Sequence, residues 1–71
     1  MQRHHYRARK LRLQRLIAKA QARVQELAAH EDTSAVGKRV RTMAARTLAR
    51  HQKSLAALVE LYGAKFNDNE G

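Results

Sequence analysis

Arginine and lysine side chains recur along this chain at spacings that place them on one side of a helix. Residues three, four or seven positions apart share a helix face. We name two such sets the first basic stripe, Arg12, Arg15, Lys19 and Arg23, and the second basic stripe, Arg39, Arg46, Arg50 and Lys53. A guanidinium group donates paired hydrogen bonds to phosphate oxygens. The spacing therefore predicts two surfaces suited to binding phosphate groups.

The positive charge of these segments is almost unrelieved by acidic residues. Fifteen Lys and Arg against six Asp and Glu give a net charge of +9, and the helix-forming segments hold only Glu26 and Glu60 as acids. Like charges at these spacings repel by a few tenths of a kcal/mol per pair, a cost that interleaved Glu normally relieves. This bias favours an anionic partner over a merely solubilising surface, although a solubilising role stays open.

The N-terminal arm, residues 3–10, adds more cations around one aromatic ring. Its basic residues include Arg3, Arg7 and Lys10. Tyr6 lies seven positions before Leu13, which favours a place in the hydrophobic seam. Stacking on a base or contact with a partner protein is the alternative role for Tyr6.

Catalytic and metal-binding chemistry have little support in the sequence. The chain has no Cys, its acids are scattered, and adjacent His4 and His5 lack the spacing that puts two ligands on one helix face. We expect no enzyme activity, no metal site and no cofactor, and we expect His51, on an apolar stripe, to be a core histidine. No apolar run suggests a signal peptide or a membrane span, so we expect a cytoplasmic protein with no membrane role.

The composition predicts an all-α chain forming a single domain over residues 1–71. There is no Pro, there are only three Gly, and strong helix formers dominate. We expect a helix over about 2–30, a turn at about 30–34, a helix over about 34–65 and a polar tail at 67–71. Alternating spacings of four and three residues predict the hydrophobic core, which consists of Leu13, Ile17, Ala20, Val24, Leu27, Val40, Ala44, Leu48, Leu55, Leu58 and Tyr62.

Two helices of similar length joined by a short turn predict an antiparallel hairpin. A lone hairpin leaves much of both apolar stripes in water, and 71 residues without Cys have few other means of stabilisation. We therefore expect a homodimer, with two hairpins packed as a four-helix bundle.

The C-terminal segment ELYGAKFNDNEG, residues 60–71, resembles the end of Rop-like proteins. Those are short plasmid-encoded hairpins that dimerise into four-helix bundles and bind RNA, so the resemblance implies the same fold and RNA binding. The chain departs from that family in its first helix, where Leu, Ile and Ala replace the aromatic residue of the RNA-binding face. In architecture alone, the hairpin is also similar to small phage proteins that dock on host regulators, such as quorum-sensing anti-activators.

Two functional hypotheses follow from these patterns. The first is a small regulator that binds RNA or DNA through phosphate contacts made by the two basic stripes and the N-terminal arm. The alternative is a phage- or plasmid-type inhibitor or adaptor that docks on a host regulatory protein. That second mode would use the N-terminal arm and Leu11, an apolar residue outside the seam.

Overall fold

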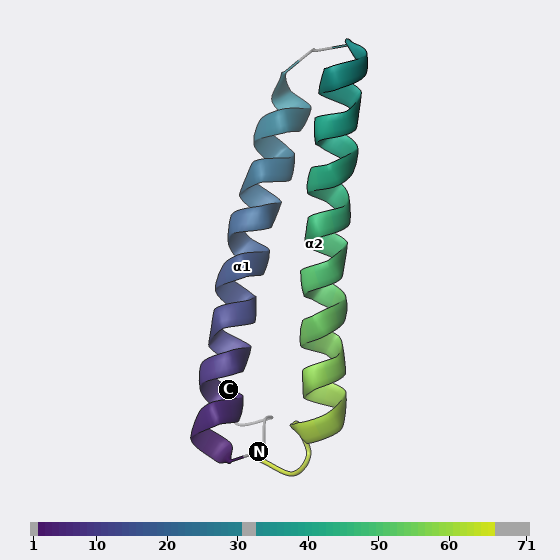
Figure 1. Cartoon of the computed structure of the whole chain (residues 1–71). Coiled ribbons are helices and arrows are strands. Elements are labelled where there is room, and N and C mark those ends of the chain that lie inside the picture. The colour runs from purple at the N-terminus through teal and green to yellow at the C-terminus, as the bar shows by residue number, and fades with distance from the viewer. Residues whose placement is uncertain (1, 31–32, 67–71) are drawn as a thin grey trace.

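The computed structural model describes residues 2–30 and 33–66 and contains two long helices in that part of the chain. Helix α1 (Arg3–Ala29) and helix α2 (Ala35–Tyr62) run antiparallel and pack side by side along their length (Figure 1). The hairpin measures 47 × 17 × 16 Å. The predictions of an all-α fold and of an antiparallel hairpin are confirmed.

The turn between the helices lies where the sequence predicts it. Helix α1 ends before His30, whose extended backbone breaks the helix while its N–H donates to the Leu27 carbonyl at 3.3 Å. Ser34 begins α2, because its Oγ accepts a hydrogen bond from the Gly37 N–H at 3.0 Å. This is the N-cap arrangement that satisfies a free amide of a helix start.

Helix α2 ends at Tyr62, earlier than the predicted end at about residue 65. Gly63 follows, and a glycine weakens the continuation of a helix. Residues 63–66 form a turn instead, in which the Phe66 N–H donates to the Tyr62 carbonyl at 3.1 Å. The predicted polar tail at 67–71 lies outside the described residues.

The expected core residues line the contact between the helices, but the hairpin alone encloses few of them. Leu58 is 6% exposed, and the other expected core residues are only half-buried, namely Leu13, Ile17, Ala20, Val24, Leu27, Val40, Ala44, Leu48, Leu55 and Tyr62. Two helices form a single layer, so each apolar stripe has a neighbour on one side only. Much apolar surface remains in contact with water.

Three aromatic rings close the open end of the hairpin. Tyr6 of α1 contacts both Tyr62 and Phe66, with ring-centroid distances of 6.3 Å and 5.2 Å. Tyr62 and Phe66 are themselves 6.2 Å apart. Tyr6 is only 1% exposed, so it belongs to the seam. The hairpin leaves almost none of the Tyr6 ring exposed, and a contact of Tyr6 with a partner stays a prediction.

Candidate partner-binding surface

The first basic stripe is an exposed row of cations on α1. All four of its side chains are exposed, and in the described part of the chain no ion pair joins them to a carboxylate. The described residues contain only Glu26 and Glu60 as acids. The stripe therefore keeps its charge available for an external anion.

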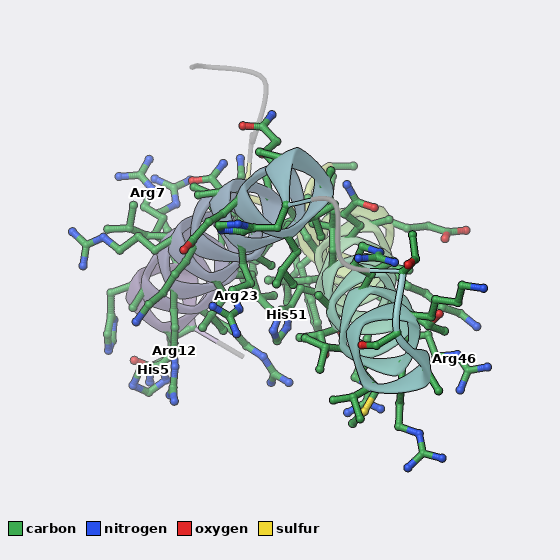
Figure 2. The ribbon with its side chains drawn as sticks, turned by 90° about the horizontal axis from the view of Figure 1, so that it is seen from above. His5, Arg7, Arg12, Arg23, Arg46 and His51 are labelled. Carbon is green, nitrogen blue, oxygen red and sulfur yellow. The ribbon has the colours of Figure 1, made fainter. Side chains whose placement is uncertain are left out.

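The second basic stripe is also exposed, but it lies on a different side of the molecule. Figure 2 shows Arg12 and Arg23 on the same side of the hairpin as His51. Arg46 instead extends outward from the edge of α2 that faces away from α1. The two stripes therefore do not merge into one continuous surface. Sequence spacing within each helix cannot reveal this separation, because it depends on how the two helices face each other.

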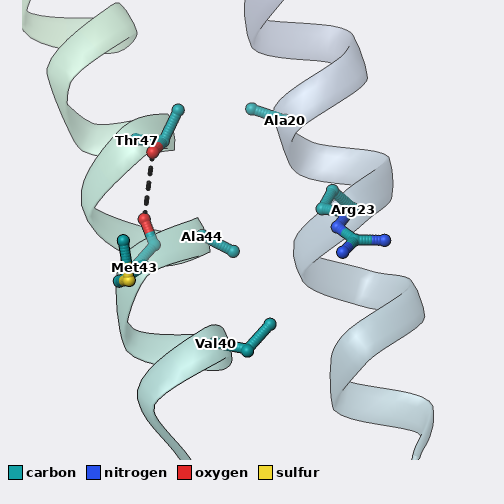
Figure 3. A pocket seen from close by; sticks show the side chains of 6 residues that line it. All are labelled: Ala20, Arg23, Val40, Met43, Ala44 and Thr47. Carbon is teal, nitrogen blue, oxygen red and sulfur yellow. Dashed lines mark hydrogen bonds between the residues drawn. The ribbon is translucent and has the colours of Figure 1, made fainter. Parts of the chain in front are cut away.

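A shallow apolar groove separates the two stripes. Ala20 and Arg23 of α1 form one wall, and α2 supplies the rest of the lining, which consists of Val40, Met43, Ala44 and Thr47 (Figure 3). The Thr47 hydroxyl donates to the Met43 carbonyl at 3.0 Å, so its polar group is satisfied within α2. The groove thus offers methyl groups and a thioether beside one guanidinium group.

A second hollow lies farther along the same side of the hairpin, where His51 lines it together with α1. The α1 residues that line it are Ala8, Arg9, Arg12, Leu13 and Leu16. His51 is half-buried, like most of the residues expected in the core. We name the side of the hairpin that carries both hollows the groove face, and we define it by Arg12, Arg23, Met43, Thr47 and His51.

A third hollow surrounds Leu11 on α1. Leu11 is 47% exposed and shares this hollow with Ala8 and Leu16, while the cations Arg12, Arg15 and Lys19 surround the apolar side chains. The prediction that Leu11 lies outside the seam is consistent with this exposure. An apolar spot ringed by cations is suited to an acidic protein surface as well as to a polyanion.

Three apolar side chains of α2 are largely exposed. Val36, Met43 and Leu61 are 72%, 59% and 71% exposed. Val36 and Met43 lie at the edge of the apolar face of α2, where α1 leaves them exposed. The sequence contains a sign of this edge position. Val36 and Met43 are seven residues apart and share one direction on the helix, beside the central row of Val40, Ala44 and Leu48.

The N-terminal arm contributes fewer free cations than its composition suggests. Arg3 and Arg7 are exposed, and Arg7 points outward from α1 (Figure 2). Lys10 is half-buried beside the seam. The rings of His4 and His5 lie 4.1 Å apart. Among residues 2–30 and 33–66, no cluster of three potential metal ligands occurs.

Comparisons with known proteins identify no relative of this chain. No protein-family model matches it, and no curated protein or solved structure matches it significantly. The resemblances to Rop-like proteins and to phage inhibitors therefore stay predictions. Neither described helix combines the length and the apolar character that crossing a membrane requires.

Proposed function

We propose that this chain is a non-enzymatic module that binds nucleic acid through phosphate contacts. The observation that carries the proposal is the first basic stripe, four exposed cations with no ion-paired carboxylate in the described chain. Such a row attracts polyanions at long range and binds phosphates by releasing their counterions. A regulator of this kind acts in the cytoplasm, where RNA and DNA targets are present.

The first basic stripe suits this role better than the second. From Arg12 to Arg23 the helix rises about 16 Å, a length that spans roughly five phosphates of one strand measured along a duplex axis. All four of its side chains line a hollow that also offers apolar side chains, Arg23 in the groove between the helices and Arg12, Arg15 and Lys19 around Leu11. Arg7 points to the other side of α1 from Arg12 and lies outside this stripe (Figure 2). In the second basic stripe, Arg46 lies on the outer edge of α2 (Figure 2).

Matched charge reversals test this assignment. The triple variant Arg12→Glu, Lys19→Glu and Arg23→Glu removes most of the first basic stripe. The control, Arg39→Glu, Arg46→Glu and Arg50→Glu, makes the same change in net charge on the second. We expect the first variant to lose binding to a labelled RNA hairpin or DNA duplex, and the control to weaken it much less. Equal losses, with helicity retained in both variants, would show that only net charge matters.

A second candidate function rests on the hollow around Leu11. An exposed leucine among Arg12, Arg15 and Lys19 suits an acidic helix or loop of a regulatory protein, as in a phage- or plasmid-type inhibitor. Such an interface depends on apolar contact and resists salt better than phosphate binding does. Substitution of Leu11 distinguishes the two modes.

A further inference from the structure

The side of the hairpin opposite the groove face carries no charge along its centre. Positions two apart in a helix point about 200° from each other, so Gln21 lies across α1 from Arg23, and Ala45 lies across α2 from Met43 and Thr47. Since Arg23, Met43 and Thr47 line one groove, Gln21 and Ala45 share the opposite side of the hairpin. We name this side the uncharged face, formed by Gln14, Gln21, Ala28, Ala45, Gln52 and Ala56, all of them exposed.

We propose that the uncharged face packs against a second copy of this chain. Half-buried apolar side chains, including Ile17, Leu48 and Val59, lie beside its exposed glutamines and alanines. Covering this face would complete the burial that a single hairpin leaves unfinished. The inference does not depend on nucleic-acid binding.

Charge decides which face a second copy can cover. On the groove face, a partner copy would have to cover Arg9 and Arg23, and its own helices offer only Glu26 and Glu60 as counter-charges. Burying an unpaired guanidinium group costs several kcal/mol. On the uncharged face, two copies that each carry a net charge of +9 bring no charged side chain to the centre of the contact.

The size and the side chains of this face suit a stable contact. One side of the hairpin measures 47 Å by 17 Å. The projected area of the whole side, its charged ends included, is about 800 Å², of the same order as the accessible surface that each partner buries in a standard interface. Small side chains such as Ala28 and Ala45 let helices approach closely, and glutamine amides can pair with one another across the contact. Residues seven positions apart share a helix face, so this side also carries cations, but only toward its two ends, where a polar rim belongs. They are Arg3, Arg7 and Lys10 at the open end and Lys38 and Arg41 at the end near the turn.

The arrangement leaves both groove faces and both first basic stripes on the outside of the dimer. The apolar side chains Val36, Met43 and Leu61 stay uncovered by it. If the second copy covered the groove face instead, Thr47 would be the shielded position and Gln52 the accessible one. That alternative gives the experiment its control.

Adding one lysine to each face in turn tests the proposal. In sedimentation equilibrium the wild-type chain should have twice its mass of 8.1 kDa. We expect Gln52→Lys to weaken the dimer at least about tenfold, the effect of roughly 1.4 kcal/mol. Thr47→Lys, on the groove face of the same helix, should leave the dimer intact. A wild-type monomer at about 100 µM, where a micromolar dimer would be fully formed, would overturn the inference, as would dissociation by Thr47→Lys alone.

If Gln52→Lys fails to fold, protection of an introduced thiol shows which face the second copy covers. The chain has no cysteine, so Gln52→Cys and Thr47→Cys each introduce a single thiol. The thiol at position 52 should react with a maleimide more slowly as protein concentration rises, while the thiol at position 47 should react at a constant rate. Constant reactivity at position 52 would overturn the inference. A monomer that still binds nucleic acid would leave the proposed function standing.

Discussion

The rings of Tyr6 and Phe66 lie 5.2 Å apart, joining the first turns of α1 to the turn that follows α2. Tyr6 is the most deeply buried side chain described, at 1% exposure, in a hairpin whose other apolar residues are mostly half-exposed. The aromatic cluster therefore fixes how the open ends of the two helices meet. It also fixes the register of α1 against α2 along the helix axes.

Replacing Tyr6 should destabilise the fold severely. Truncating a buried aromatic side chain to alanine costs about 3–5 kcal/mol, which is a large share of the stability of so small a protein. We expect Tyr6→Ala to lower the midpoint of thermal unfolding, followed by circular dichroism, far more than Leu11→Ala. Leu11 is 47% exposed on the same helix and serves as the control. Equal effects of the two substitutions would contradict the buried position of Tyr6.

Removing the cap of α2 should have a smaller effect. The Ser34 hydroxyl accepts the Gly37 N–H at 3.0 Å, and losing such a cap costs about 1 kcal/mol. We expect Ser34→Ala to lower the urea midpoint with an unchanged m-value, and Ser34→Asp to restore the midpoint. A midpoint that Ser34→Ala leaves unchanged would show that another residue caps the helix.

Leu11 separates the two candidate functions. If the chain binds phosphates, Leu11→Asn should leave nucleic-acid affinity within about twofold, since no phosphate contact is lost. Leu11→Asp should reduce affinity further, because its carboxylate enters the ring of Arg12, Arg15 and Lys19. Binding abolished by the uncharged Leu11→Asn, measured by anisotropy, would instead indicate an apolar contact at this site.

Much of this fold follows from the sequence, for local reasons. The lack of Pro and the strong helix formers predict both helices, although the predicted end of the second helix is about three residues too late. The seven-residue relation of Tyr6 to Leu13 predicts that Tyr6 belongs to the seam. These signals lie within one helix or at its ends, where spacing and propensity suffice.

The arrangement of the surface could not be predicted in the same way. Whether the two basic stripes merge depends on the relative rotation of two helices, which no single-helix pattern encodes. The exposure of Met43 likewise depends on how far α1 reaches around α2. The contrast between Gln21 and Arg23, two positions apart, becomes meaningful only once the groove between the helices is located.

Salt should act in opposite directions on the two proposed contacts. Screening weakens the repulsion between two chains of net charge +9 each, so self-association should tighten as salt rises. Phosphate binding should weaken over the same range, because counterion release becomes less favourable. Sedimentation and anisotropy across one salt series compare the two trends. A dimer that dissociates as salt rises would mean that ion pairs hold it together.

The central claim is that the first basic stripe binds phosphates, and the most direct test is anisotropy of a labelled RNA hairpin and a DNA duplex across a salt series. We expect sub-micromolar binding at low salt and a linear log–log decline, with a slope of about −0.9 per phosphate contact on duplex DNA and a smaller slope per contact on single strands. The triple variant Arg12→Glu, Lys19→Glu and Arg23→Glu should abolish binding. Weak binding by the wild-type chain at low salt, or a variant that binds with the wild-type slope, would contradict the claim and direct the search to a protein partner.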